Sequence, residues 1–183
     1  MSKIILILVA VVVVVLGGLA LISFADNSNS KMPQVGEMAP NFTLPSEKGT
    51  DVSLDSLRGK WVVLYFYPAD MTSGCTMEAH NFEHDLARYN ALNAEIVGVS
   101  VQSVASHQKF CAKDGLTFTL LSDTTHKVVA EYGSLGNYLG YKIANRNTFL
   151  INPEGKIVKV WTKVDPAHHS QEVLAALHEF EKS

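Results

Sequence analysis

Beyond Val35 the sequence alternates between two hydrophobic periods, and this alternation limits the choice of fold. Three short runs are rich in β-branched or aromatic residues, which is typical of strands buried in a sheet. These runs cover residues 61–67, 95–101 and 117–121. Between them, apolar residues recur at steps of three and four, which indicates helices with one buried face. The clearest faces hold Ala79, Phe82, Leu86 and Tyr89, and then Val104 with Cys111.

The C-terminal part adds a hairpin and a helix. Residues 148–152 and 156–162 flank the turn sequence Pro-Glu-Gly, which is typical of a β-hairpin. Asp165 followed by Pro166 predicts the N-cap and first position of a closing helix. Strands and helices that alternate before a terminal hairpin and helix predict an α/β sandwich around a mixed sheet.

The first 25 residues predict a targeting segment. Residues 4–22 form an uncharged, almost wholly apolar run after Lys3, which we expect to be a hydrophobic helix. A small-x-small pattern at Ser23 and Ala25 favours a cleaved signal peptide. An apolar length close to the thickness of the hydrocarbon core favours a retained membrane anchor, which we prefer.

The segment after this run is polar, so residues 26–34 are expected to be a linker and residues 35–183 a single domain. A lysine precedes the apolar run and an acid follows it. The positive-inside rule then predicts that the domain lies on the extracytoplasmic (periplasmic) side, either membrane-anchored or secreted.

The reactive chemistry is expected at residues 68–75, between the end of a strand and the start of a helix. A thiol in that position faces unpaired backbone N–H groups and the positive end of the helix dipole, and both favour thiolate over thiol. Cys75 is therefore a candidate nucleophile. The alternative is a buried structural cysteine, which is a common fate of free cysteines.

Three motifs identify a family. Pro68, Thr72 and Cys75 reproduce the pattern Pro-x-x-x-Thr-x-x-Cys, residues 39–44 read Ala-Pro-Asn-Phe-Thr-Leu, and residues 146–151 read Arg-Asn-Thr-Phe-Leu-Ile. Over roughly residues 35–180 the chain resembles the peroxiredoxins, and among them the bacterioferritin-comigratory or Q-type branch. The resemblance implies a thioredoxin-like fold, with a central mixed sheet flanked by helices.

The resemblance also implies residue roles and a thiol-dependent peroxidase activity. Cys75 would be the peroxidatic cysteine, whose thiolate attacks a hydroperoxide and becomes a sulfenic acid. Thr72 would hydrogen-bond the thiolate and the peroxide, and Pro68 would shield them from water. Arg146 would favour the thiolate and stabilise the charge that develops as the O–O bond breaks; otherwise it is an ordinary solvated arginine. No cofactor and no metal are implied.

A second cysteine is expected to resolve the sulfenic acid. The commonest Q-type arrangement places it on the same helix as the first, where this sequence has His80. Cys111, on the next predicted helix, resembles the resolving cysteine of the less common arrangement and would form an intramolecular disulfide with Cys75. Two alternatives stay open: Cys111 is a small core residue near Val104, or the enzyme is a one-cysteine peroxidase that uses an external thiol.

The expected partners are hydrogen peroxide, small organic hydroperoxides and a thioredoxin-like reductant, and the resemblance implies a monomer. An extracytoplasmic domain would need an exported or membrane-relayed dithiol reductant. The formal net charge of −3 and the lack of any run of Lys or Arg exclude nucleic acid. The membrane would be a partner only through an uncleaved 4–22 segment.

Two other classes of protein compete with the peroxidase. Two cysteines in an exported chain can form a permanent structural disulfide. A membrane-tethered copper-binding protein with a thioredoxin fold would need soft and borderline ligands near Cys75. The candidate histidines are His80, His84, His168 and His169. Paired helical histidines are more often surface residues, which disfavours copper.

Overall fold

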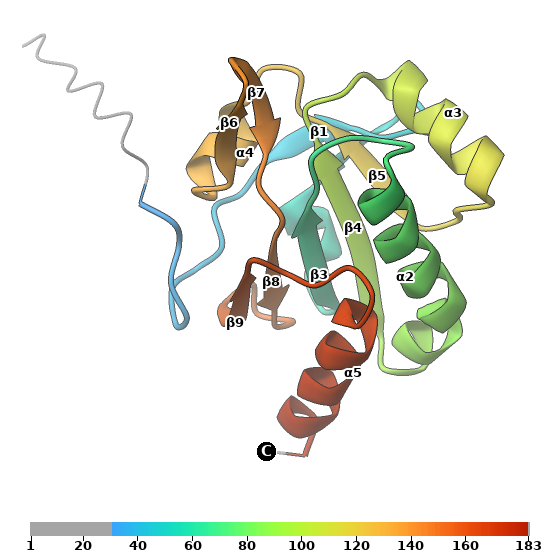
Figure 1. Ribbon diagram of the computed structural model, residues 1–183. Coiled ribbons are helices and arrows are strands. Elements are labelled where there is room, and N and C mark those ends of the chain that lie inside the picture. The colour runs from blue at the N-terminus through green and yellow to red at the C-terminus, as the bar shows by residue number, and fades with distance from the viewer. Residues whose placement is uncertain (1–30, 183) are drawn as a thin grey trace, which may run out of the picture.

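The computed structural model describes residues 31–182. The predicted signal peptide or anchor over residues 1–25 and its hydrophobic helix lie outside these residues. A five-stranded sheet forms the centre (Figure 1). Its strands in spatial order are β5 (Thr119–Ser122), β4 (Ala94–Ser100), β3 (Trp61–Phe66), β8 (Asn147–Ile151) and β9 (Ile157–Thr162). The pairs β3–β4 and β4–β5 are parallel, whereas β3–β8 and β8–β9 are antiparallel, so the predicted mixed sheet is confirmed.

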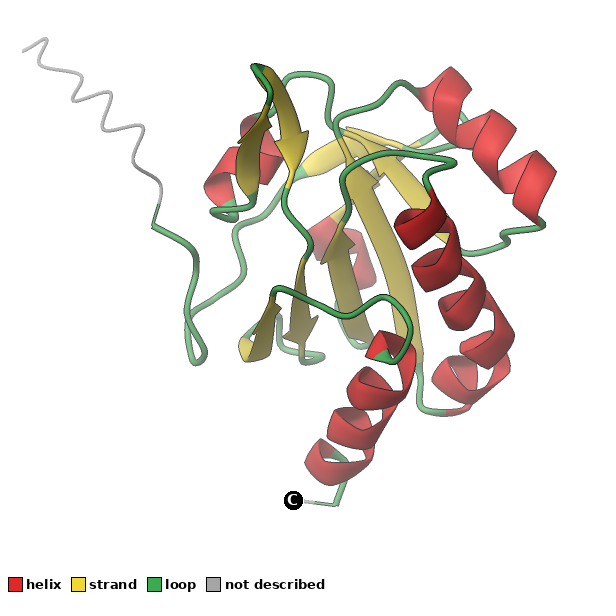
Figure 2. Cartoon of the chain, in the orientation of Figure 1, coloured by secondary structure: helices red, strands yellow, loops and turns green. Residues whose placement is uncertain are grey.

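Helices flank this sheet, as the thioredoxin-like prediction requires (Figure 2). The longer helices are α2 (Ser73–Ala91), α3 (Val104–Asp114) and α5 (His169–Phe180), and the short ones are η2 (Leu54–Leu57) and α4 (Lys127–Glu131). Two small antiparallel pairs complete the fold: β1 (Thr43–Pro45) with β2 (Asp51–Ser53), and β6 (Leu135–Tyr138) with β7 (Tyr141–Ala144). These pairs and α4 are not among the predicted elements.

The last helix starts later than predicted. The carbonyl oxygen of Asp165 accepts hydrogen bonds from the backbone N–H groups of His168 and His169, and its carboxylate accepts one from Ala167. Asp165 therefore caps a turn that precedes the helix, and α5 itself begins at His169.

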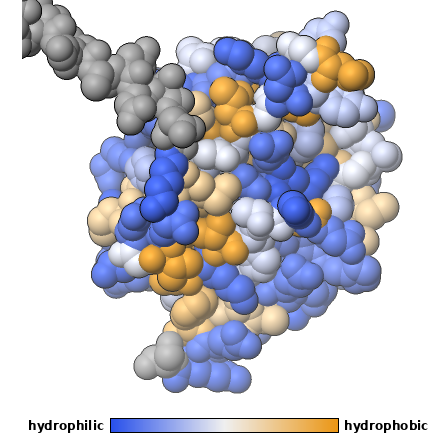
Figure 3. All heavy atoms as spheres, turned by 60° about the vertical axis from the view of Figure 1, so that its left-hand side comes forward, coloured by the Kyte–Doolittle hydropathy of each residue, from blue (hydrophilic) through white to orange (hydrophobic). Residues whose placement is uncertain are grey.

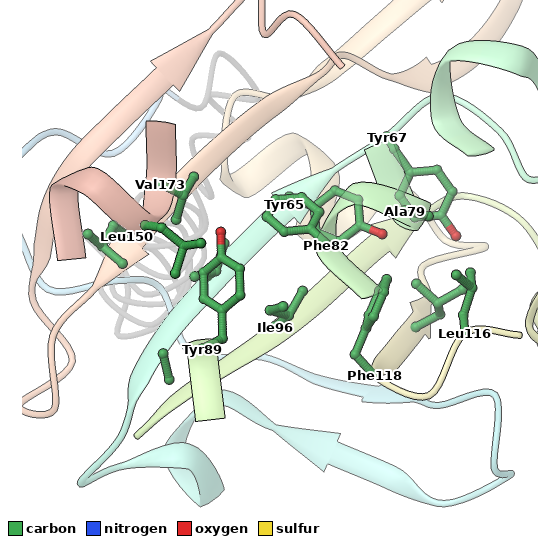
Figure 4. Packing of buried hydrophobic residues seen from close by; sticks show 14 of the residues in the cluster. Tyr65, Tyr67, Ala79, Phe82, Tyr89, Ile96, Leu116, Phe118, Leu150 and Val173 are labelled. Atoms are coloured by element: carbon green, nitrogen blue, oxygen red, sulfur yellow. The ribbon is translucent and has the colours of Figure 1, made fainter. Parts of the chain in front are cut away.

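Successive residues of β3 point to opposite faces of the sheet and enter two separate cores. Val63 and Tyr65 join the cluster beneath α2 and α5, whereas Leu64 and Phe66 join the cluster on the other face. The Tyr65 and Phe82 rings are 5.0 Å apart at the centre of the first cluster (Figure 4). The predicted helical face is confirmed, because three of its members on α2 are completely buried: Ala79, Phe82 and Tyr89.

The N-terminal segment covers parts of both sheet edges. Met38 forms an antiparallel bridge with Lys156 beside β9, and Ser46 forms one with Leu121 of β5. Met32, inside the predicted linker, packs against the second core cluster. The segment that precedes β1 is thus part of the folded unit.

The surface mixes polar and apolar side chains. On the face in Figure 3, apolar patches are interrupted by polar groups. Within residues 31–182, no helix combines the length and apolar character needed to cross a membrane.

His169 makes the fold sensitive to acid. Its side chain is fully buried, with Nε2 2.8 Å from the Thr148 hydroxyl and Nδ1 3.7 Å from the Glu172 carboxylate, too far for a hydrogen bond. Burial, assisted by the nearby charge of Arg146, lowers the pKa of His169 from 6.5 to about 4. The neutral ring is therefore favoured in the folded state. The contribution of the neutral His169 ring to the free energy of unfolding is complete above pH 6.5, and it is lost as the pH falls from 6.5 toward 4.

We expect His169→Gln to reduce this acid sensitivity, because glutamine keeps a donor but does not titrate. The wild type should lose about 3 kcal/mol more unfolding free energy than the variant between pH 7 and pH 4. Urea unfolding at both pH values measures the difference. His168→Gln is the matched control, since His168 is exposed beside Asp165 and should show the wild-type loss. An equal acid loss in His169→Gln and the wild type would contradict the prediction.

Candidate active site

Cys75 lies in the first turn of α2, just after the central strand β3. Thr72 is the N-cap residue, with extended backbone angles, and the helix begins at Ser73. Cys75 is the third helical residue and is 2% exposed. The first N–H groups of a helix have no partners within the helix, and they carry its positive partial charge. The predicted environment, a thiol at the positive end of a helix, is thus confirmed.

Arg146, in the connection between β7 and β8, reaches this sulfur. Its Nη2 lies 3.3 Å from Cys75 Sγ, and its Nη1 donates to Glu78 Oε2. A Cβ atom at Gly74 would lie 3.4 Å from Nη2, so the glycine leaves room for the guanidinium against the first turn. The structure therefore brings Arg146 and Cys75 together, although 71 residues separate them in the sequence.

Glu78 fixes the second arm of the guanidinium. It lies one turn after Cys75 on α2, is 1% exposed, and its Oε1 has no hydrogen-bond partner within the described residues. Burial raises the pKa of Glu78 to about 7, against the opposing effect of Arg146. Burial by itself lowers the pKa of Arg146, but Glu78 and Cys75 outweigh it and raise that pKa above its usual value. The arginine is therefore charged and oriented beside the sulfur.

Thr72 and Pro68 belong to the segment that connects β3 to α2, just before Cys75. The Thr72 hydroxyl is exposed and donates to the carbonyl oxygen of Ala69, at 3.0 Å. The single hydroxyl proton thus goes to Ala69 and not, as expected, to the Cys75 thiolate, while the lone pairs of the oxygen stay available as acceptors. Pro68 is half-buried and follows the fully buried Tyr67 at the end of β3.

Cys111 lies in the last turns of α3, one helix farther along the chain. Both cysteines are free thiols, and Cys111 is half-buried against the edge of the first core cluster. Burial, with a smaller effect from Glu47, raises the pKa of Cys111 to about 11. In this arrangement Cys111 is a protonated thiol and hence a weak nucleophile.

Sequence reasoning missed three polar groups of the site. They are Glu78, Asp70 and His107. The Nδ1 atom of His107 lies 2.9 Å from Oδ2 of Asp70, and both of these side chains are fully buried. Glu78 could have been found from its spacing, because a residue three positions after Cys75 lies on the same side of the helix. Nothing in the local pattern distinguishes Asp70 or His107 from surface residues.

The candidate ligands of the copper-binding alternative do not gather around Cys75. His80 pairs with Asp114 at 3.2 Å, and the His84 side chain is 86% exposed beside Asp85. Within residues 31–182 no group of three or more His, Cys, Asp or Glu side chains could hold a metal ion. The copper-binding alternative therefore has no support from this geometry.

Comparison with known proteins identifies the family. The model of the AhpC/TSA family matches residues 35–160. The chain belongs to the AhpC/TSA family. Among curated relatives of this peroxiredoxin, the putative peroxiredoxin bcp of Coxiella burnetii is 45% identical over 148 residues, which cover 79% of this chain and 98% of the relative. Peroxiredoxin Bcp of Bacillus subtilis is 40% identical, over 79% of this chain and 94% of the relative.

Solved structures give the same assignment. A cysteine-to-serine mutant of Xylella fastidiosa PrxQ matches with a TM-score of 0.78 and 34% identity, over 83% of this chain and 99% of that one. Peroxidoxin BcpB of Mycobacterium tuberculosis matches with a TM-score of 0.76 and 33% identity, over 81% and 98%. The resemblance to the Bcp or Q-type branch is confirmed. The peroxiredoxin is a thiol-dependent peroxidase, and hence an oxidoreductase, and the alternative functions are not favoured.

The predicted location is wrong. We expected a membrane-anchored or secreted domain on the extracytoplasmic side, but the matched relatives are Bcp and Q-type proteins, and those whose names state a compartment are chloroplastic. The prediction depended only on the apolar length and flanking charges of residues 1–25, which lie outside the residues matched by the family. An apolar N-terminal run by itself does not identify the compartment of a protein. The site residues that define the family do not identify it either.

Proposed function

We propose that Cys75 reduces hydrogen peroxide and small organic hydroperoxides, and that Cys111 resolves the oxidised enzyme. The observation that carries the proposal is the contact between Arg146 Nη2 and Cys75 Sγ, at 3.3 Å in the first turn of α2. A permanent positive charge and a helix N-terminus both favour a thiolate, which is the nucleophilic form of cysteine.

In the first step the Cys75 thiolate attacks the terminal oxygen of the hydroperoxide. An S–O bond forms while the O–O bond breaks, and the leaving alkoxide takes a proton to become an alcohol, or water from hydrogen peroxide. Arg146 stabilises the negative charge that moves onto the oxygens. The Thr72 hydroxyl, whose proton goes to Ala69, offers its lone pairs to the peroxide O–H, and Pro68 limits the access of water.

In the second step the Cys111 sulfur attacks the sulfenic acid, an S–S bond forms, and water leaves. Two solved structures of Xanthomonas campestris Peroxiredoxin Q are named as mutants of two cysteines whose sequence separation equals that of Cys75 and Cys111. This equal spacing supports Cys111, and not an external thiol, as the resolving residue.

The proposed reductant is a thioredoxin-like dithiol protein, which would reopen the disulfide by thiol–disulfide exchange. An exported reductant is not part of this proposal, because the predicted extracytoplasmic location is wrong. We propose that the enzyme works as a monomer, and sedimentation equilibrium should give the mass of one chain.

Replacing Cys111 with serine tests the resolving step. After one equivalent of hydrogen peroxide, the wild type should lose two hydrogens by intact-mass analysis, whereas Cys111→Ser should gain one oxygen and, with excess peroxide, a second and third. The first oxidation should keep its wild-type rate within about threefold, since the serine leaves the surroundings of Cys75 unchanged.

Turnover with a dithiol reductant provides the second measurement. Cys111→Ser should turn over slowly, because no intramolecular disulfide forms. Rapid oxidation without a disulfide in the wild type would instead establish a one-cysteine peroxidase. The absence of rapid oxidation at Cys75 in both proteins would refute the proposed role of Cys75.

A further inference from the structure

A buried polar cluster joins the loop before Cys75 to the helix that carries Cys111. At its centre is the carboxylate of Asp70, two residues before the N-cap Thr72. Asp70 accepts hydrogen bonds from Ser106 Oγ at 2.6 Å and from Tyr67 Oη at 2.7 Å. Ser106 belongs to α3, so this carboxylate bonds directly to the neighbouring helix.

His107 completes the cluster. Its Nδ1 lies 3.0 and 2.9 Å from the two oxygens of Asp70, and its Nε2 lies 3.1 Å from the carbonyl oxygen of Leu121 on β5. A carboxylate and a carbonyl oxygen both accept hydrogen bonds, so both ring nitrogens of His107 face an acceptor. Burial raises the pKa of Asp70, but hydrogen bonds from His107 and Ser106 outweigh burial and lower it overall. The cluster is thus buried and hydrogen-bonded through every side chain at its centre.

The position of the cluster relates it to the resolving step. His107 lies one helical turn before Cys111 on α3, and Asp70 lies five residues before Cys75. A disulfide needs its two sulfur atoms about 2.05 Å apart and its Cα atoms about 4.4–6.8 Å apart. Cys75 is enclosed in the first core cluster, whereas Cys111 only packs against its edge. Both thiols are free in this structure, so the sulfur atoms must move together before the bond can form, and the cluster ties the loop before Cys75 to the helix that carries Cys111.

We propose that the cluster formed by Tyr67, Asp70, Ser106 and His107 is a latch whose opening controls the rate at which Cys111 reaches the Cys75 sulfenic acid. The inference rests on the proposed roles of the two cysteines. While the latch is closed, the sulfenic acid stays beside Arg146, where a second hydroperoxide can oxidise it to a sulfinic acid, transferring one oxygen and leaving an alcohol or water. The strength of the latch thus sets the partition between disulfide formation and overoxidation.

Ser106→Ala tests the latch with a small change. It removes one hydrogen bond to a charged group, while Tyr67 and His107 still satisfy Asp70. Loss of such a bond should speed disulfide formation by about tenfold. Rapid-quench intact mass after one equivalent of hydrogen peroxide gives the rates of sulfenic acid formation and of disulfide formation separately. The sulfinic fraction at high peroxide should fall by a similar factor, and the first oxidation should keep its wild-type rate.

Ser170→Ala is the matched control. Ser170 Oγ donates to the buried carboxylate of Asp85 at 2.7 Å and joins α5 to α2, so the variant loses the same kind of bond away from α3. It should lose comparable unfolding free energy in urea but resolve at the wild-type rate.

Three outcomes would overturn the latch. Wild-type resolution in Ser106→Ala would show that the cluster is only structural, and equal acceleration in Ser170→Ala would show that general destabilisation is the cause. No Cys75–Cys111 disulfide in the wild type would refute the proposed function and the latch with it, whereas the first two outcomes leave the proposed function intact.

Discussion

Cys75→Ser is expected to abolish the reduction of hydroperoxides. Serine differs from cysteine by one atom, so the first turn of α2 should stay folded around a side chain that is 2% exposed in the wild type. The hydroxyl group is not ionised near neutral pH and is a much weaker nucleophile toward a peroxide oxygen than a thiolate. Loss of a covalent nucleophile lowers the rate of comparable enzymes by about 10⁶-fold.

The measurement is peroxide consumption by reduced protein, followed over a single turnover with equal concentrations of wild type and variant. Thermal unfolding of Cys75→Ser should stay within a few degrees of the wild type, which separates loss of chemistry from loss of fold. Cys111→Ser is the matched control, because it removes the other thiol and should keep the first oxidation. Peroxide consumption by Cys75→Ser at even a hundredth of the wild-type rate would place the reactive group elsewhere.

Arg146→Met is expected to give the second largest loss. It removes the guanidinium that lies 3.3 Å from Cys75 Sγ and leaves an uncharged side chain that replaces only the aliphatic part of arginine. Removal of one preorganised donor at a site of developing charge costs about 10²–10³-fold in rate. The second-order rate constant for oxidation of Cys75 by hydrogen peroxide should fall by that factor. The pKa of Glu78, already raised to about 7, should rise further because its cation is gone.

Arg146→Lys and Arg88→Met sharpen this test. Lysine restores the charge but lacks the two guanidinium nitrogens, so it cannot contact Cys75 and Glu78 together. Arg146→Lys should therefore oxidise only about tenfold faster than Arg146→Met. Arg88 bonds the buried Asp85 from the same helix α2, at 3.2 Å, but lies far along it from Cys75. Arg88→Met should therefore change the oxidation rate by less than about twofold. A wild-type rate in Arg146→Met would contradict the proposed electrostatic role.

Most of the central fold could be predicted, because its elements bury one or both faces. Periodicity located β3 and α2, and the turn sequence located the β8–β9 hairpin. The β6–β7 pair was missed because its tip exposes large apolar side chains, so no alternation of inward and outward residues is visible. These exposed residues are Tyr138, Leu139 and Tyr141. The five-residue helix α4 is too short to show a period.

The candidate site could be predicted only where a motif exists. Cys75, Thr72 and Pro68 lie together in one stretch of sequence, whereas Arg146 was placed by its resemblance to the family and its contact needed the tertiary fold. Buried charges are the hardest to foresee, since charged residues are rarely buried unless they are paired. Glu78 and the Asp70–His107 pair are such cases, because each depends on a partner from another element.

The bridges from Met38 to Lys156 and from Ser46 to Leu121 lie on the two open sides of the sheet. A strand with a free row of N–H and C=O groups can pair with a strand of another molecule, and this is how sheet proteins aggregate or exchange segments. Residues 38–46 therefore occupy one backbone position at each side of the sheet, where a strand of another molecule could otherwise pair. Chains shortened from the N-terminus into this stretch should expose both sides of the sheet and also lose the buried side chains of Ala39, Phe42 and Leu44 from the second core.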